Sequence, residues 1–203
     1  FPTRRSSDLH TAETLGMTQN DLEKSTNALL DYLQDEREDI KVTITLKGTQ
    51  TEAFNARESA HMTDVKNLYQ FALVLRNVAF VLLAASLIYM FVRLKKGMWT
   101  IISINYMKTA ILAAVFFAML AGWTFVDFDA FWTTFHKIAF RNDLWLLNPA
   151  TDLMINLFPA EFFSSLVFRI VGFFAFSFVG FFVLSYLYLR HRLRKLHGEM
   201  ENE

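Results

Sequence analysis

The stretch "LYQFALVLRNVAFVLLAASLIYMFV", from Leu68 to Val92, is a long apolar run that is interrupted by Arg76 and Asn77. An α-helix needs about 20 mostly apolar residues to cross a bilayer. Two further segments have the same character, "TAILAAVFFAMLAGWTFVDF" at residues 109–128 and "LVFRIVGFFAFSFVGFFVLSYLYL" at residues 166–189. The sequence therefore predicts an all-α integral membrane protein with three transmembrane helices.

The composition agrees with the membrane class. The chain has 203 residues, of which 53% are hydrophobic and 22 are Phe, and its mean hydropathy is +0.25. The formal net charge is zero, so no overall field favours nucleic acid, and no nucleic-acid partner is expected. Cysteine is absent, which excludes disulfides, thiolate zinc sites and a thioester intermediate on the enzyme.

The distribution of basic residues predicts how the spans are oriented. The loop at residues 93–108 and the tail at residues 190–203 are rich in Lys and Arg, so both are predicted to be cytoplasmic. Residues 10–67 and 129–165 then lie on the extracytoplasmic side. A further membrane helix would have to lead out to residues 10–67, which predicts four helices in the intact protein with the first one missing here.

The first nine residues, "FPTRRSSDL", have a different predicted origin. The end of a common sequencing adapter can encode them, so residues 1–9 are interpreted as an assembly artefact and excluded from the fold. The sequence also begins without Met, which agrees with the expectation of a lost first helix.

The outer segment at residues 10–67 has the pattern of a small α/β unit. Thr18 is a candidate N-cap for an amphipathic helix. Its apolar stripe consists of Leu22, Leu29, Leu30 and Leu33. "KVTITL", at residues 41–46, alternates as a strand does, and "KGTQ" follows as a turn. Asn55 and Glu58 form a capping-box pattern, and the helix that they start is predicted to continue into the first span.

Two histidines stand out by their position. His61 lies just before the first span and His136 just after the second, so the predicted orientation places both at the same membrane surface. Glu58, His61 and Asp64 are three residues apart in turn, which makes successive pairs neighbours on a helix face. A carboxylate one turn away can hold an imidazole in one tautomer and raise its basicity.

The segment around His136 is also rich in polar residues. Its apolar stripe predicts a helix in the membrane interface. The stripe consists of Phe131, Trp132, Phe135 and Ala139. Asn142 and Asp143 follow within two turns of His136, and Asp152 marks a possible new helix start. Asp143 is therefore a candidate partner for His136.

Each of these features has a simpler structural interpretation. An interfacial His beside a carboxylate is often only a satisfied polar pair, and Trp132 and Trp145 fit an aromatic belt. For Arg76 this interpretation is weaker, because an ionisable residue within a span is a functional candidate by default. The basic tail fits a topology signal and contact with anionic lipids.

Metal binding is a further alternative. Side chains with nitrogen or oxygen ligands are available near both histidines, but no HExxH or comparable spacing occurs, so the signal is weak. The side chains concerned are Glu58, His61, Asp64, His136 and Asp143.

Two blocks of sequence resemble a known family. They are "RESAHMTDVK" at residues 57–66 and "FHKIAFRNDLWLLNPATDLMINLFPAEFF" at residues 135–163. Together they are similar to the bacterial integral membrane family that includes the lipoprotein intramolecular transacylases (Lit). The resemblance extends from His10 to the tail. It implies a multi-pass protein of the bacterial cell membrane with four helices and an extracytoplasmic segment between the first two.

The resemblance also implies a reaction. The substrate partner would be a bacterial lipoprotein whose N-terminal Cys carries a diacylglyceryl thioether, embedded among membrane lipids. The enzyme would move the sn-2 acyl chain from the glycerol to the α-amino group of that Cys, which gives the lyso-form lipoprotein. No cofactor and no metal are expected for this reaction, and the site would face the extracytoplasmic side.

Apart from Arg76 in the first span, the residues given roles by this interpretation lie in the two sequence blocks. His61 and His136 would be the catalytic pair, with Asp64 and Glu58 orienting His61. Asp143 would orient His136. The donor to the developing oxyanion would be Asn142, Arg76 or a backbone amide.

Two rival functions remain at this stage. They are a non-enzymatic membrane scaffold and a metal-dependent membrane hydrolase. A separation of more than about 10 Å between the two imidazoles, with no cleft between them, would exclude a shared site.

Overall fold

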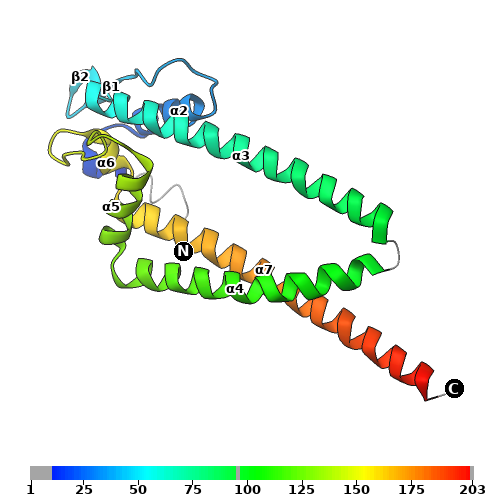
Figure 1. Cartoon of the computed structure of the whole chain (residues 1–203). Helices are drawn as coiled ribbons and strands as arrows, with labels where there is room; N and C mark the ends of the chain where they lie inside the picture. The colour runs from blue at the N-terminus through cyan, green and yellow to red at the C-terminus, as the bar shows by residue number, and fades with distance from the viewer. Residues whose placement is uncertain (1–10, 95–96, 202–203) are drawn as a thin grey trace. The chain divides into compact units, whose positions relative to one another are not determined.

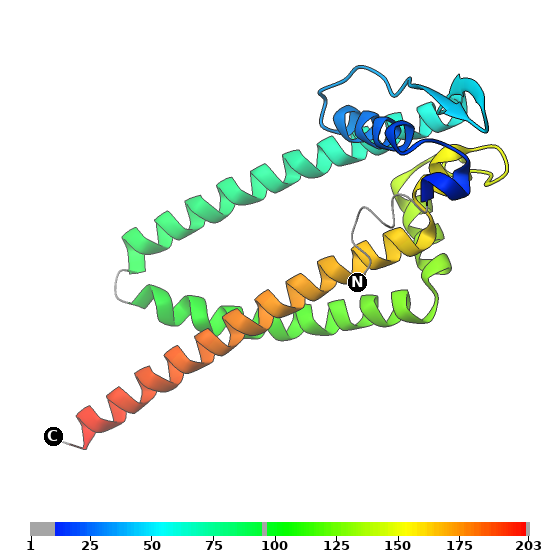
Figure 2. The same cartoon turned by 180° about the vertical axis from the view of Figure 1, so that it is seen from behind.

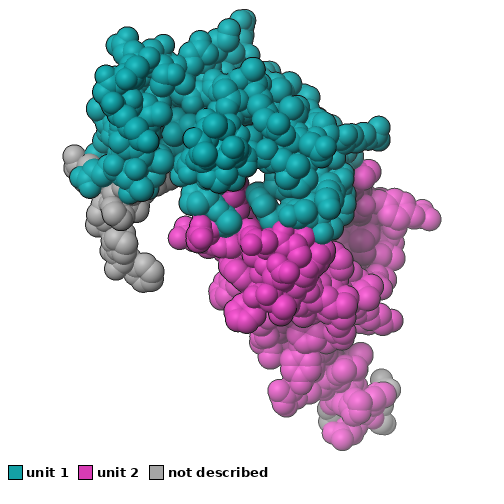
Figure 3. Space-filling model, turned by 90° about the vertical axis from the view of Figure 1, so that its left-hand side faces the viewer, with its two compact units in different colours: residues 1–78, 132–160 teal, residues 79–131, 161–203 magenta. Residues whose placement is uncertain are grey.

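The computed structural model describes residues 11–94 and 97–201. The predicted artefact at residues 1–9 lies outside the described residues. The chain divides into two compact units: residues 1–78 with 132–160, and residues 79–131 with 161–203. Figure 3 shows the two units in different colours. We call them unit 1 and unit 2 and describe each by itself.

Unit 1 contains helix α2 (Gln19–Leu33), whose first turn is fixed as the sequence predicts. The Thr18 side chain accepts a hydrogen bond from the backbone N–H of Asp21, which satisfies one free donor of that turn. The predicted stripe is wrong at one position, because Leu29 is buried whereas Leu30 is 48% exposed. The buried face is instead completed by Ser25, Ala28 and Tyr32, which follow α-helical spacing.

A β-hairpin follows α2. Strands β1 (Thr43–Leu46) and β2 (Thr49–Glu52) pair antiparallel, with Thr43 opposite Glu52 and Leu46 opposite Thr49. Lys47 and Gly48 both have positive φ, at 51° and 83°, as a two-residue hairpin turn with the twist of the strands requires. β1 confirms the predicted strand two residues later than expected. β2 has no apolar alternation and all four of its residues are exposed, so its sequence gave no signal.

The core of unit 1 joins α2, the hairpin, the first turns of helix α3 (Ala56–Leu94) and the short helix α6 (Leu153–Leu157). Asp152 is the N-cap residue of α6, at the position where a new helix start is predicted. Among the buried apolar residues are Leu22, Leu29, Tyr32, Ile44, Phe54, Met62, Leu153, Met154 and Leu157. Residues far apart in sequence therefore enclose the start of α3.

Within the described residues, three helices are long and apolar enough to cross a membrane: α3, α4 (Met98–Val126) and α7 (Ala160–Met200). As predicted, α3 runs unbroken from the capping box into the first span. The predicted loop at residues 93–108 is largely helical, since α4 already begins at Met98. Residues 98–108 contain neither Gly nor Pro and are mostly apolar, so nothing in them stops a helix.

In unit 2, α4 packs against α7. Figures 1 and 2, which view the molecule from opposite sides, both show that the two helices cross. The Tyr106 hydroxyl donates a hydrogen bond to the Phe178 carbonyl oxygen at 3.0 Å. The rings of Phe117 and Phe174 stack with their centroids 6.1 Å apart. Large apolar side chains are exposed along all three long helices, as expected for surfaces that face lipid.

Candidate active site

The structure brings the two predicted histidines together within unit 1. His61 projects from the second turn of α3, and His136 from the end of helix α5 (Phe128–Ala139). Their ring centroids are 6.1 Å apart, and each residue is only 7% exposed. This separation is well inside the limit of about 10 Å that a shared site allows.

Aromatic rings surround His136. Trp132 meets its imidazole edge to face at 4.7 Å, and Trp145 lies closer to parallel at 4.9 Å and 33°. Phe140 contacts both imidazoles, with centroids 5.3 Å from His61 and 5.6 Å from His136. The two tryptophans, assigned from sequence to an aromatic belt, therefore also form the wall of the histidine site.

A backbone hydrogen bond fixes the tautomer of His136. Its Nδ1 lies 2.8 Å from the carbonyl oxygen of Trp132. A carbonyl oxygen only accepts, so Nδ1 carries the proton and the neutral ring keeps a free lone pair on Nε2. The expected orienting partner, Asp143, has an exposed side chain with no hydrogen bond or ion pair among the described residues. The carbonyl oxygen of Trp132 therefore orients the His136 ring, a role that was expected of the Asp143 carboxylate.

His61 is held differently. Its Nδ1 is buried and has no hydrogen-bond partner in the described part of the chain. Burial, then the neighbouring His136, lowers the pKa of His61 from 6.5 to about 4, and the Asp64 carboxylate opposes that shift. Burial also lowers the pKa of His136, against the hydrogen bond to Trp132. Both imidazoles are therefore neutral at pH 7.

Glu58 does not contact His61 by a hydrogen bond. It is 1% exposed, and its two carboxylate oxygens accept from the backbone N–H groups of Asn55 at 2.8 Å and Met154 at 2.7 Å. The first bond confirms the predicted capping box. The second joins the start of α3 to the start of α6, a long-range contact that no sequence spacing indicates.

Asp64 also has a partner other than His61. Its Oδ2 accepts a hydrogen bond from the side-chain amide of Asn142 at 2.8 Å. Asn142 was expected to donate to an oxyanion, and here one of its N–H groups is directed at Asp64. The contact links α3 to the segment that follows α5.

Asn55 and Asp152, which were not assigned to the site from the sequence, join the start of α3 to the start of α6. The Asn55 side-chain amide donates to Asp152 Oδ1 at 2.8 Å, and the Asn148 backbone N–H donates to Asp152 Oδ2 at 2.7 Å. Burial alone would raise the pKa of Asp152. The pKa is nevertheless lowered by these hydrogen bonds, by a further one from Thr151 and by the charge of Arg57. The cap patterns at Asn55 and Asp152 were visible in the sequence, but their contact was not.

Arg57 and Arg76 have separate surroundings. The Arg57 guanidinium donates to the carbonyl oxygen of Asp143 and so ties the segment after α5 to α3. Arg76, a predicted oxyanion donor, is exposed and donates to Asn77 Oδ1 at 3.1 and 3.2 Å. No hydrogen bond joins Arg76 to either histidine among the described residues.

The residues considered for metal binding do not converge. Within residues 11–94 and 97–201, no three His, Asp or Glu side chains are arranged to hold an ion. The Glu58 oxygens are engaged by backbone amides and Asp64 by Asn142. The side chains that contact the two imidazoles are mainly aromatic.

Comparison with known proteins gives the same assignment as the motifs. The family model of the lipoprotein intramolecular transacylase Lit matches residues 3–163. This chain belongs to the Lit family. The protein is therefore an enzyme of the membrane, and the reaction class of its family is intramolecular acyl transfer on a lipoprotein. A comparison with curated protein sequences gave no match.

Solved structures of Lit from Bacillus cereus have the same fold. One is 20% identical, with a TM-score of 0.64 over 95% of this chain and 82% of that one. Two variants of that Lit, with one histidine replaced by arginine or by alanine, give TM-scores of 0.61 and 0.59. They are 21% and 19% identical to this chain, cover 95% of it, and are covered over 79% and 80% of their own length.

Proposed function

We propose that this member of the Lit family moves the sn-2 acyl chain of a diacylglyceryl-modified lipoprotein to the α-amino group of its N-terminal Cys. The observation that carries the proposal is the pair of buried, neutral imidazoles, 6.1 Å apart within an aromatic enclosure. Donor and acceptor belong to one molecule, so the enzyme needs to fold that molecule into a reactive shape rather than collect two substrates.

His136 is the proposed general base. Its Nε2 lone pair is free because Nδ1–H is held by Trp132. The neutral α-amine attacks the ester carbonyl, a C–N bond forms, and Nε2 takes the proton released from nitrogen. The C–O bond to the glycerol then breaks, and the imidazolium returns the proton to the leaving oxygen. A lowered pKa makes this imidazolium a stronger acid, which favours the second half of the exchange.

His61 is the proposed partner that faces the developing oxyanion. A neutral imidazole carries one N–H, and Nδ1 of His61 has no hydrogen-bond partner among the described residues. A negative oxygen beside this ring would satisfy a buried polar group that is otherwise costly. Asp64, Glu58, Asp143, Asn142 and Arg76 are not needed for proton transfer in this proposal.

The predicted orientation completes the proposal. The basic residues at 93–108 and 190–203 support a histidine site that faces the extracytoplasmic side of a bacterial membrane. The lipoprotein anchor and its ester would reach the site from the outer leaflet. The partners of the protein are then its lipoprotein substrate and the surrounding lipids.

Mass spectrometry of a reporter lipoprotein tests the proposal. The protein is expressed in a host without N-acyltransferase, and the N-terminal peptide of the reporter is analysed. We expect an N-acyl, S-monoacylglyceryl peptide that disappears with His136→Asn and with His61→Asn. His191→Asn, at an exposed position of α7, is the matched control and should leave the product unchanged. A wild-type protein that is folded in the membrane but leaves the diacylglyceryl peptide intact would favour the scaffold alternative.

A further inference from the structure

A groove of about 350 Å³ lies beside the histidine pair in unit 1. One wall is a single face of α3, because its residues are spaced i, i+3, i+4 and i+7. That wall consists of Asp64, Asn67, Leu68 and Phe71. The other wall consists of Ala139, Phe140, Arg141 and Asn142. Phe140 is shared with the active site, since its ring contacts both imidazoles.

The groove is polar at one end and apolar at the other. Along α3 the lining changes from Asp64 and Asn67 to Leu68 and Phe71, in the direction of the predicted span. Phe71 is well exposed, so the apolar end is open to an acyl chain. This order suits an amphiphile that has its charged group near Asp64 and its hydrocarbon toward the membrane.

Asp64 is the carboxylate that lines this groove, whereas the exposed Asp143 is not among the lining residues. Glu58 is fully buried beneath two backbone N–H groups, and Asp152 is bound by Asn55 and Asn148. Asp64 is partly exposed and uses one oxygen, Oδ2, for Asn142. Its other oxygen is free to accept from a ligand, and a negative charge in a groove selects a cation.

We propose that Asp64 binds the protonated α-amino group of the lipoprotein's N-terminal Cys and so docks the acyl acceptor beside the histidine pair. This inference rests on the proposed function, because that function names the substrate that carries the amine. The amine has a pKa of about 8 and is mostly an ammonium ion at pH 7, so it docks in this form. It then gives one proton to solvent at the open groove, and the resulting neutral amine is the nucleophile of the proposed reaction. Asn142 is then a positioning residue, which orients the carboxylate by its hydrogen bond.

The other charges that face the groove set the strength of this site. The end of α5 at Ala139 adds the partial negative charge of unpaired carbonyl groups, which favours a cation. Arg141 lines the same groove and opposes a cation. His61, one turn before Asp64, is neutral at pH 7 and adds no repulsion. Binding of an ammonium ion in this groove therefore depends on the Asp64 carboxylate.

The test is the pH dependence of KM and kcat in mixed micelles, with the lipoprotein as substrate. The variant is Asp64→Asn, which keeps the shape of the side chain and an oxygen for Asn142. A hydrogen bond to a charged group is worth enough to change binding about tenfold or more, so KM should rise by at least that factor near pH 7. Asp64→Glu should recover part of the loss. Glu52→Gln, at an exposed position of β2, is the charge-matched control.

The pH profile separates docking from a merely structural role. For the wild type, KM should increase above a pH of about 8, where the amine loses its proton. For Asp64→Asn, KM should be high and nearly constant across that range. A KM profile identical to wild type, or a loss of kcat at unchanged KM, would overturn the inference. A wild-type protein that forms no N-acyl product at all would overturn the proposed function instead.

Discussion

The buried carboxylate of Glu58 offers a sharp test of how this site is assembled. The perturbation is Glu58→Gln, which preserves the size of the side chain. Both carboxylate oxygens accept from backbone N–H groups, of Asn55 and of Met154. A Gln side chain keeps one acceptor and places an NH₂ group against the second N–H. The start of α3 or the start of α6 then loses its hydrogen bond inside a core where Glu58 is 1% exposed.

The expected cost follows from these contacts. Losing a hydrogen bond to a charged group, and leaving a buried donor unpaired, costs about 2–3 kcal/mol. Part of this cost is offset, because burial and the charge of Asp152 raise the pKa of Glu58 and so make its ionised form less favourable in the native state. The net destabilisation should be about 2 kcal/mol. Glu58 is ionised in the native state, because both of its carboxylate oxygens accept from N–H groups and a proton on either oxygen would face one of them.

The assay is thermal unfolding in detergent micelles, followed by tryptophan fluorescence, because Trp145 lies in unit 1. Glu58→Gln should unfold several degrees below the wild type, and the control Glu52→Gln should not differ from it. Equal melting temperatures for the wild type and Glu58→Gln would refute the reasoning. That result would mean that the carboxyl group is protonated and that one of the two bonds contributes nothing.

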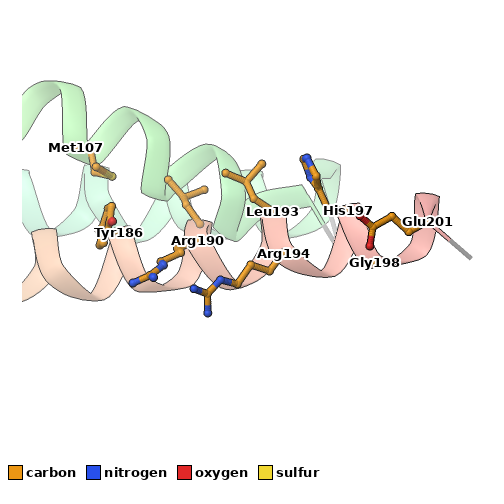
Figure 4. Close-up of a pocket in the computed structure, with 9 residues that line it drawn as sticks. Met107, Tyr186, Arg190, Leu193, Arg194, His197, Gly198 and Glu201 are labelled. Carbon is orange, nitrogen blue, oxygen red and sulfur yellow. The ribbon is translucent and has the colours of Figure 1, made fainter.

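Three further outcomes are expected. Acidification should destabilise unit 1 between a pH of about 6.5 and about 4, because His61 is protonated in the unfolded chain at a higher pH than in the buried site. The full loss of unfolding free energy is about 3 kcal/mol, measured by unfolding at different pH values. A stability that does not change with pH in this range would contradict the prediction. Leu29→Ala should cost about 2–5 kcal/mol, whereas Leu30→Ala should change stability by less than about 0.5 kcal/mol; equal effects would contradict the burial of α2. A groove of about 660 Å³ in unit 2, shown in Figure 4, is lined by Met107 of α4 and by the last turns of α7, which carry Arg190, Arg194 and His197, with Glu201 just beyond the helix. Replacing both arginines by Gln should reduce co-purified anionic lipid in lipid mass spectrometry, and unchanged lipid content would argue against the contact.

Local features of the fold were predictable, because their causes lie within a few residues. The Thr18 cap, the Asn55–Glu58 capping box and the continuity of α3 depend on neighbours in sequence, and the structure confirms all three. Strand β2 has no local apolar pattern, and its pairing is fixed by the turn at Lys47 and Gly48. Helix α4 begins at Met98, within the predicted loop, because a cluster of basic residues indicates topology and does not mark where a helix begins.

The proximity of His61 and His136 was predictable from the sequence, but the hydrogen bonds around them were not. His61 and His136 were selected because both flank a span on the same side. Their actual neighbours depend on folding over long sequence distances. Glu58 bonds to Met154, and Asp64 bonds to Asn142, and neither pairing has a period or a motif. The carboxylates that lie near the histidines in the sequence therefore make their hydrogen bonds to other groups.

The unbroken course of α3 also defines a length. His61 precedes the first residue of the predicted span, Leu68, by one continuous helical stretch with no hinge. At a rise of 1.5 Å per residue, the imidazole lies about 10 Å along the axis from that point. In the proposed reaction, this helical length would set the distance along α3 between the start of the predicted span and the lipid ester. Adding one residue between Asp64 and Leu68 would turn His61 by about 100° around the helix axis and move it by only about 1.5 Å along that axis.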